Sequence, residues 1–401
     1  MLELEEALAK ILSVLPATES ESVPLNQAHQ RILAERLLAP INIPVFDNSA
    51  MDGYAVRAAD VQGANVEAPV GLQMRGRVPA GENFAGEVLP GTCVRIFTGS
   101  PLPRGADAVI MQEDTRIDPT APETVLCLDT IKPWENVRLQ SEDIKRGIPL
   151  GEKGEVITAG RIGLLAAMGL NEVHVGRRPV VGLLATGSEL VEAGQPLEPG
   201  KIYESNRLML ATLLEQAGVS ARIYPLVVDT MADTQAALQK AMDECDVVVT
   251  SGGVSVGEMD FIKSAWEQLS GDLQFWKVAI KPGRPFVFGR CRGKYLFGLP
   301  GNPVSAFVTF LLLVRPALMQ WQGATDVALP VHFGILTEPL SNPGDRRHFM
   351  RVIVDAAGKV RSAGAQASHI LGSLAAANGL VDVPPKTTFQ TGDTVKVLRW
   401  E

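Results

Sequence analysis

The sequence lacks the basic excess and the aromatic content that nucleic-acid binding requires. Lysine and arginine total 37 among 401 residues, against 45 aspartates and glutamates, which gives a formal net charge of −8. A general nucleic-acid binder has the opposite balance, because it must neutralise phosphates. Aromatic residues make up only 5% of the chain, too few for a base-stacking surface. We therefore expect no nucleic-acid partner.

Cysteine and histidine are also scarce and have no metal-binding spacing. The four cysteines lie far apart and none forms a CxxC pair, which argues against a thiolate zinc site and a disulfide framework. The five histidines show no HExxH or similar ligand spacing. The P-loop and GxGxxG motifs are missing as well.

The longest apolar run is too short to span a membrane. It extends from Val304 to Val314 and includes Ser305 and Thr309, whereas a spanning helix needs about 20 apolar residues. The stretch MLELEEALAK has glutamates where a secretory signal has lysine or arginine before an apolar segment. We expect a cytoplasmic protein without membrane contact.

Glycine and proline, by contrast, are abundant and cluster in loops. The chain has 38 glycines and 27 prolines, and 46% of its residues are apolar, enough for a substantial core. At about 150 residues per domain, its length predicts two to three domains. Apolar spacing predicts a first helix over 2–15, which Pro16 ends, and a second over 25–37, before Pro40.

The predicted elements change character along the chain and suggest its domains. Short strands between Gly, Pro and Asp turns indicate a β-rich insertion at about 45–143 within an N-terminal region of residues 1–176. Strands then alternate with helices, which predicts a three-layer α/β domain with a mostly parallel sheet over 177–325. Short alternating strands over 326–401 predict a small β-barrel or sandwich. The predicted fold class is multi-domain, α/β plus β.

The loops after the strands of the α/β domain are the first candidates for a binding site, because open α/β sheets bind ligands at the carboxyl ends of their strands. The loop SGGVSVGEMD (251–260) follows one predicted strand and opens a helix. Its glycines allow backbone N–H groups to point into one concavity, which would cradle a phosphate. The alternative is a tight strand-to-helix turn. The candidate binding residues are Ser251, Gly252, Gly253, Ser255 and Gly257.

Three carboxylates fall at successive strand ends of the same domain: Glu189, Asp229 and Asp260. Acids beside a phosphate cradle repel the ligand unless a divalent cation bridges them, so the pattern predicts Mg²⁺. The alternative is a set of solvated loop acids, with Asp260 serving only as an N-terminal helix residue.

A basic tract, KVAIKPGRP (277–285), complements these acids. On an extended chain Lys277 and Lys281 point to the same side, and Arg284 follows in a proline-constrained loop. The alternative is a solvated strand edge protected by lysine. The segment GLPGNPVS (298–305) is a second anion-type loop, with the candidates Pro300, Asn302 and Ser305. The residues alone thus indicate a Mg²⁺-assisted enzyme acting on a small phosphorylated anion.

Seven motifs occur in order along nearly the whole chain: NSAMDGYAVR (48–57), TGSPLPRGADAVIMQED (98–114), TGSEL (186–190), TSGGVSVGEMDF (250–261), KPGRP (281–285), GLPGNPVSAF (298–307) and SHILGSLAAANGL (368–380). They resemble those of the MoeA family, the molybdopterin molybdenumtransferases related to the E domain of gephyrin. The resemblance implies the last step of molybdenum-cofactor synthesis, in which adenylylated molybdopterin and molybdate react with Mg²⁺ and AMP is released. It also implies a homodimer, with further partners among the proteins of cofactor synthesis.

The resemblance assigns roles that spacing alone does not. It implies that Asp52, Thr98 and Asp143 reach the α/β domain of the partner subunit, although Asp52-Gly53 by itself predicts only a turn. It makes Lys277, Lys281, Ser305, Arg351 and Ser368 candidates for contacting molybdate and phosphate. Glu189, Asp229 and Asp260 would hold Mg²⁺.

Some positions depart from the family pattern, and two other functions stay open. Ser141 and Ala367 stand where glycine is common, Arg284 where lysine is common, and Gly372 where serine is common. One alternative function is an adenylyltransferase or pyrophosphatase, because the α/β domain resembles that of the upstream adenylylating enzymes. The other is a non-catalytic pterin carrier or scaffold.

Overall fold

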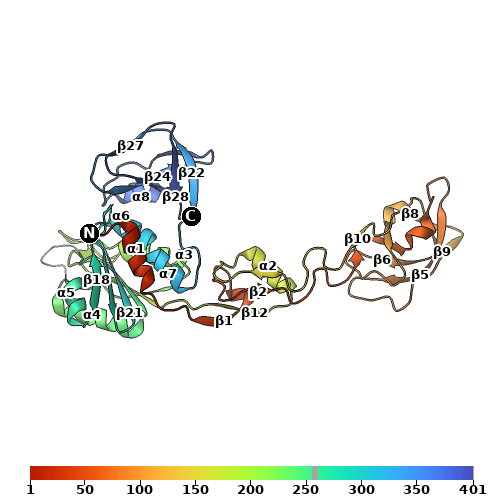
Figure 1. Cartoon of the computed structure of the whole chain (residues 1–401), viewed down its shortest axis with the longest axis horizontal. Coiled ribbons are helices and arrows are strands. Elements are labelled where there is room, and N and C mark those ends of the chain that lie inside the picture. The colour runs from red at the N-terminus through yellow and green to blue at the C-terminus, as the bar shows by residue number, and fades with distance from the viewer. Residues whose placement is uncertain (255–260, 401) are drawn as a thin grey trace. The chain divides into compact units, whose positions relative to one another are not determined.

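The computed structural model describes residues 1–254 and 261–400. Contacts between residues divide the chain into two compact units (Figure 1). Unit 1 comprises residues 1–35, 153–159 and 172–401, and unit 2 comprises residues 36–152 and 160–171. The domain limits inferred from the sequence remain predictions.

Unit 1 is built on a six-stranded, mostly parallel sheet, which confirms the predicted α/β fold. The first four strands in the spatial order are parallel, and the last two continue the sheet antiparallel as a hairpin and an edge strand. That order is β16 (Ala221–Ile223), β13 (Val181–Ala185), β17 (Val247–Ser251), β21 (Lys294–Leu299), β20 (Val287–Cys291) and β18 (Asp272–Trp276).

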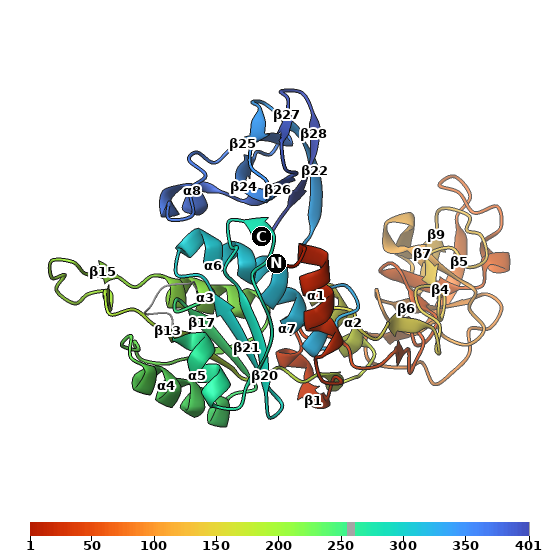
Figure 2. The same cartoon turned by 60° about the vertical axis from the view of Figure 1, so that its left-hand side comes forward.

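Helices cover both faces of this sheet and form a separate core on each (Figure 2). Alternate strand residues serve the two cores: Val247 and Val249 belong to one and Val248 to the other, as the pleat requires. The helices of the first core are α1 (Leu4–Ser13), α3 (Asn206–Gln216), α6 (Pro303–Thr309) and α7 (Arg315–Trp321). Those of the second are α4 (Met231–Glu244) and α5 (Ile262–Gln268).

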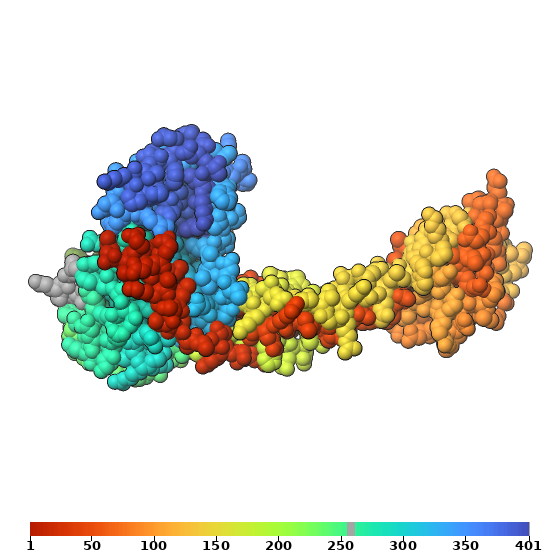
Figure 3. Space-filling view, viewed as in Figure 1, coloured from red at the N-terminus to blue at the C-terminus, as the bar shows by residue number. Residues whose placement is uncertain are grey.

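The helical stretch from Pro303 to Trp321 is long and apolar enough to cross a membrane by composition alone. A π-helical segment, Phe310–Val314, joins α6 to α7 within it. However, 83% of its most apolar window is buried inside the protein, where it packs on α1 and α3. Figure 3 shows α1 (red) lying over this part of unit 1. The stretch is therefore a core helix.

The C-terminal part of unit 1 is a closed barrel, which settles the predicted choice between barrel and sandwich. Its five strands close because β24 pairs with both β25 and β26. In order they are β24 (Arg347–Val354), β25 (Lys359–Ser362), β22 (Val331–Leu336), β28 (Thr394–Leu398) and β26 (Gly379–Val383). The pair β23 (Leu340–Asn342) and β27 (Thr387–Phe389) and the helix α8 (Leu371–Ala376) accompany the barrel. β19 (Ile280–Lys281) pairs with β24 and so joins the lysine tract to the barrel.

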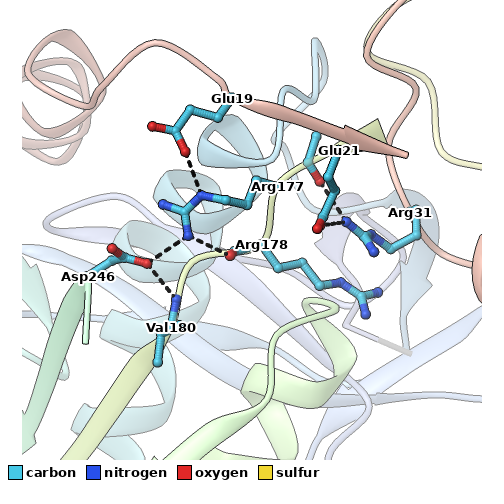
Figure 4. Close-up of polar contacts among 8 residues, drawn as sticks. Glu19, Glu21, Arg31, Arg177, Arg178, Val180 and Asp246 are labelled. Carbon is cyan, nitrogen blue, oxygen red and sulfur yellow. Dashed lines mark hydrogen bonds and ion pairs between the residues drawn. The ribbon is translucent and has the colours of Figure 1, made fainter. Parts of the chain in front are cut away.

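A two-stranded ribbon, β1 (Ser20–Pro24) with β12 (Glu172–Gly176), is tied to the central sheet by ion pairs (Figure 4). Arg177 donates to Glu19 at 2.8 Å and to Asp246 at 3.0 Å, and Asp246 also accepts the Val180 N–H at 2.9 Å. Burial alone would raise the pKa of Asp246, but the hydrogen bonds from Arg177 and Val180 outweigh it and lower the pKa.

Unit 2 is a β-rich module. Its sheet has the order β7 (Ala108–Met111), β4 (Gly53–Val56), β6 (Thr92–Ile96), β5 (Val70–Val78), β9 (Ala121–Cys127) and β8 (Thr115–Asp118). Two further pairs are β2 (Leu37–Leu38) with β11 (Pro149–Gly151) and β3 (Asn48–Ser49) with β10 (Val137–Arg138). The helix α2 covers Ala159–Ala167, and short 3₁₀ turns cover Ala58–Val61 and Gln112–Asp114. Ile43 and Ile144 exchange backbone hydrogen bonds of 2.8 and 3.0 Å in the segments that connect the β2–β11 pair to the rest of unit 2.

The predicted helix over 25–37 is wrong. Only a 3₁₀ turn forms, at Leu25–Gln27, and Gln30 has a φ of +60°, which ends helical geometry. The backbone instead pairs with other segments, since Ile32 bridges Val156 and Leu33 bridges Val175. Tertiary pairing thus overrides the local helical pattern.

Candidate functional site

A cavity of about 600 Å³ lies at the carboxyl ends of β13, β17 and β21, where the sequence predicts a binding site. We call it the sheet-end cavity. Seven predicted site residues line it: Glu189, Asp229, Ser251, Gly252, Gly253, Pro300 and Asn302. Ser255, Gly257 and Asp260 lie outside the described residues.

Two glycines of this cavity hold backbone conformations that side chains disfavour. Gly252 and Gly253 have φ angles of +92° and +67°. A Cβ on Gly252 would lie 2.6 Å from the carbonyl oxygen of Thr186. The Gly252 N–H donates to the Leu299 carbonyl at 3.1 Å, so it joins the β17 loop to the end of β21 rather than serving a ligand. At Gly252, then, the requirement for glycine comes from the tight loop itself.

Glu189 and Asp229 place carboxylates in the sheet-end cavity from neighbouring loops. Asp229 Oδ2 accepts the Ser188 N–H at 2.8 Å, and the Asp229 N–H donates to Ser188 Oγ at 3.2 Å. Among residues 1–254 and 261–400 no group of three His, Cys, Asp or Glu side chains could by itself hold a metal ion. The two acids nonetheless supply hard oxygen donors, and Mg²⁺ is commonly held by one or two carboxylates together with substrate phosphates.

The sequence reasoning missed the segment that starts α3. Tyr203, at the end of β15 (Ile202–Tyr203), and Asn206 both line the sheet-end cavity. β15 pairs with β14 (Leu190–Val191). Glu204, which also lines the cavity, forms a buried ion pair with Arg207, in which the Arg207 Nε donates at 3.1 Å. The available signal was a short strand followed directly by polar residues and a helix, at the sheet edge where ligands bind.

A second cavity, of about 610 Å³, lies beside the first and shares Pro285 with it. We call it the lysine-tract cavity. The predicted residues Lys281, Arg284, Ser305 and Ser368 line it, together with Arg346, which the sequence reasoning missed. The α/β domain contributes Ser305 to this cavity, and the C-terminal region contributes Arg346 and Ser368. The two regions are hydrogen-bonded here, since Ser368 O accepts the Val304 N–H at 3.1 Å.

Lys277 lies apart from Lys281, and the expected continuous strand across them is wrong. β18 ends at Trp276, β19 begins at Ile280, and Lys277 has a φ of +79°. The Lys277 Nζ lies 3.6 Å from the centre of the Trp276 ring. Lys277 lines neither the sheet-end cavity nor the lysine-tract cavity, as far as the described residues form them.

Arg351 supports the lysine-tract cavity from below without lining it. Its side chain is 1% exposed and donates to the carbonyls of Ala365 at 2.8 Å and Ala367 at 3.2 Å. These residues lead directly to Ser368, so Arg351 fixes the loop that carries that serine. Burial lowers the pKa of the Arg351 guanidinium.

His348 lies beside the same basic residues. It pairs with Lys281 across β24 and β19, and its side chain is 3% exposed. Burial lowers the pKa of His348 to about 4, and the charges of Lys281, Arg351 and Arg346 add to the effect. The imidazole is therefore neutral at pH 7.

In unit 2, Asp52 and Thr98 form a hydrogen-bonded pair. Asp52 Oδ1 accepts both the Thr98 backbone N–H and the Thr98 hydroxyl at 2.8 Å. The backbone bond, followed by the hydroxyl bond, lowers the pKa of Asp52 and keeps it ionised. Asp143 lies where the module closes, with its N–H donating to Ile43 O at 3.1 Å.

Curated proteins with similar sequences extend over almost the whole chain. "Molybdopterin molybdenumtransferase" of Haemophilus influenzae is 40% identical over 404 aligned positions, which cover 99% of this chain and 98% of that protein. The chain belongs to the MoeA family of molybdopterin molybdenumtransferases. The Bacillus subtilis member of the family is 35% identical, with 98% of this chain and 93% of that protein covered.

The parts of the chain match the MoeA family one by one. Residues 2–169 match "MoeA N-terminal region (domain I and II)", residues 182–320 match "Probable molybdopterin binding domain", and residues 334–400 match "MoeA C-terminal region (domain IV)". The crystal structure of the molybdopterin biosynthesis MoeA protein from Pyrococcus horikoshii superposes with a TM-score of 0.83 at 32% identity and covers 100% of both chains. Family and fold class are thus confirmed.

Proposed function

We propose that this chain catalyses the insertion of molybdenum from molybdate into adenylylated molybdopterin, assisted by Mg²⁺, with release of AMP. As a molybdopterin molybdenumtransferase it is an enzyme of molybdenum-cofactor synthesis. The adenylylated form of the substrate, the metal and the release of AMP are the further content of the proposal.

The observation that carries the proposal is that a cavity lined by acidic side chains lies next to a cavity lined by basic side chains. The sheet-end cavity contains Glu189 and Asp229, and the lysine-tract cavity contains Lys281, Arg284 and Arg346. They meet at Pro285. A substrate with a pyrophosphate next to a site of oxyanion attack needs this combination, because a metal requires acids and a free oxyanion requires cations.

Each cavity then has a distinct task in the reaction. Glu189 and Asp229 would hold Mg²⁺, which as a Lewis acid promotes cleavage of the phosphoanhydride. Lys281 and Ser305 would hold molybdate next to the dithiolene of the substrate, and Arg351 keeps Ser368 in place beside them. The glycine loop after β17 lets the pyrophosphate come close to the backbone.

We further propose that the chain works in the cytoplasm as a homodimer and exchanges its substrate and product with other proteins of cofactor synthesis. In this dimer Asp52, Thr98 and Asp143 of one subunit complete the cavities of the other. The hydrogen bonds from Thr98 keep Asp52 ionised, which is the form that can bind a cation in the partner's cavity.

The deciding assay supplies the purified chain with adenylylated molybdopterin, molybdate and Mg²⁺ and follows AMP. Molybdate-dependent release of AMP is expected. Binding of the substrate without this release would indicate a carrier instead, and formation of adenylylated molybdopterin from molybdopterin and ATP would indicate an adenylyltransferase.

The metal assignment has its own test in Glu189→Gln. We expect this variant to need about tenfold more Mg²⁺ for half-maximal AMP release, because a neutral amide is a weaker ligand than a carboxylate. Glu198→Gln, the same change in the exposed loop between β14 and β15, serves as the control and should leave the Mg²⁺ dependence unchanged. Equal Mg²⁺ dependence of both variants and the unmodified chain would remove Glu189 from the metal site.

A further inference from the structure

Asn206 bridges the two glycine-containing loops of the sheet-end cavity with a single amide group. Its Nδ2 lies 2.7 Å from Ser251 Oγ, at the end of β17, and 2.7 Å from the Gly301 carbonyl oxygen, just after β21. Asn206 is 8% exposed and Ser251 is 2% exposed, so water does not compete for these bonds.

The orientation of this amide follows from its partners. A backbone carbonyl only accepts hydrogen bonds, so the atom next to Gly301 O must be the NH₂ group. The same NH₂ group must therefore donate its other hydrogen to Ser251 Oγ. The opposite atom, Asn206 Oδ1, is buried and has no hydrogen-bond partner within the described part of the chain, in agreement with this orientation.

This donation determines what the Ser251 hydroxyl can do. A hydroxyl whose oxygen already accepts a hydrogen bond from an amide has its own hydrogen left for another acceptor. Asn206 itself offers no acceptor at that contact, so the hydroxyl hydrogen is directed elsewhere. Ser251 lines the sheet-end cavity, whose proposed occupant carries phosphate oxygens.

We propose that Asn206 is a positioning residue that sets the polarity of the Ser251 hydroxyl, so that Ser251 donates its hydrogen to an anionic oxygen of the substrate. The inference rests on the proposed function, because it takes the substrate to present phosphate oxygens at this end of the sheet. Asn206 acts through Ser251 and through the fixed spacing of the two loops.

The test reverses the polarity with Asn206→Asp, which has nearly the same shape. A carboxylate accepts the Ser251 hydrogen and turns the lone pairs of Oγ toward the substrate, whereas Asn206→Ala only removes the bridge. We expect kcat/KM for adenylylated molybdopterin to fall about tenfold in N206A and about a hundredfold in N206D, mainly through KM. Equal losses, or a larger loss in N206A, would overturn the proposal.

The Ser251→Ala background isolates the hydroxyl from other effects of a buried acid. Without the hydroxyl, the difference between N206D and N206A should shrink, and a difference of unchanged size would assign the effect to Gly301 or to folding. Should N206D fail to fold, the N206A/S251A cycle decides, since losses smaller than additive support the coupling and additive losses refute it.

Gln322→Glu is the matched control. Gln322 is a buried amide whose Nε2 donates to the carbonyls of Ala217 at 3.1 Å and Leu318 at 3.0 Å, away from both cavities. This variant should lower the melting temperature but leave KM unchanged. If the unmodified chain releases no AMP at all, the proposed function fails and this inference with it, whereas an active chain with equal N206D and N206A losses refutes this inference alone.

Discussion

Gly252 cannot take a side chain without moving the ends of two strands. Its positive φ disfavours any other residue, and a Cβ there would collide with the carbonyl of Thr186, which follows β13. Steric fit at the backbone, more than direct ligand contact, explains the glycine at this position. At this position the addition of a single methyl group is enough to disturb the site.

Gly252→Ala should lower both stability and activity. We expect a loss of about 3 kcal/mol in the free energy of unfolding and at least about a tenfold loss in the rate of AMP release, because strain and a clash combine. Gly194→Ala is the control: it has a φ of +90° but nothing within 4 Å of its Cβ. It should cost only about 1 kcal/mol and leave the rate unchanged, as urea unfolding and AMP assays would show. Equal effects would mean that the Thr186 contact is unimportant.

His348 should make stability depend on pH. Its pKa is about 4 in the fold and 6.5 as the ordinary value, so the unfolded chain binds the proton more readily between these pH values. The stabilising effect of the neutral imidazole is therefore present above pH 6.5 and is lost as the pH falls toward 4. Urea unfolding should show about 2 kcal/mol less stability at about pH 5 than at about pH 7 from this group.

His348→Gln isolates that contribution. The variant keeps a polar side chain of similar length without a proton-binding site in this range, so its stability should decline less over the same pH interval. Identical pH profiles of the two proteins would show that other groups cause the decline.

At the scale of elements, the ion pairs of Figure 4 hold the β1–β12 ribbon to the start of β17. Asp246 is the common acceptor, because its Oδ2 accepts hydrogen bonds from both the Arg177 guanidinium and the Val180 N–H. Replacement of the carboxylate leaves the partly buried Arg177 guanidinium with Glu19 as its remaining ion-pair partner, and removes the acceptor of the Val180 N–H as a charged group.

Asp246→Asn should lower the free energy of unfolding by about 1–2 kcal/mol. The control is Asp243→Asn, an exposed aspartate on α4 that accepts only from Gln239 at 2.8 Å within the hydrogen bonds described. Its effect should stay below about 0.5 kcal/mol. Urea unfolding of both variants at about pH 7 compares them, and equal costs would contradict the role of the Arg177 contact.

The elements also show what can be predicted from the residues and what cannot. Strands β13, β17 and β21 are mainly apolar runs with a glycine within two residues of their ends, so the strands and a binding site at their ends are predictable, Glu189 and Asp229 included. The 25–37 segment has helical spacing, but its pairing partners are about 120 to 145 residues away, at Val156 and Val175. Such long-range pairing leaves no local signal.

The same reason explains the side chains that were misplaced or missed. Lys281 lines the lysine-tract cavity and Lys277 does not, because a positive φ at Lys277 interrupts the strand between them. The spacing of the two lysines does not reveal this interruption. Asn206 becomes important only because Ser251 and Gly301 fold against it. Arg351, a candidate for contacting substrate, is buried and donates to the loop before Ser368, an arrangement that spacing does not reveal.

At the scale of the whole molecule, the two units divide the predicted site residues between them. Asp52, Thr98 and Asp143 belong to unit 2, whereas both cavities belong to unit 1. If the site is shared between two subunits, defects in different units should compensate for each other.

Co-expression of Asp52→Ala and Asp229→Ala chains tests this sharing. Each variant alone should be inactive, but in a mixed dimer one site combines an intact unit 1 with an intact unit 2. Random pairing makes half of the dimers mixed, with one active site in each, so about one quarter of the full activity should return. Light scattering checks the dimer, and no recovery of AMP release would place each site within a single subunit.

The reciprocal hydrogen bonds between Ile43 and Ile144 bear on how residues 45–143 are inserted in the chain. The pair of β2 with β11 and the bonds between Ala39 and Ile148 extend the same two-stranded connection, so the two ends of this segment lie side by side. A turn that joins Ile43 to Ile144 would therefore span only a short gap. Asp143 is the last residue of the segment that such a turn would remove, so the shortened chain would lose this acid together with Asp52 and Thr98.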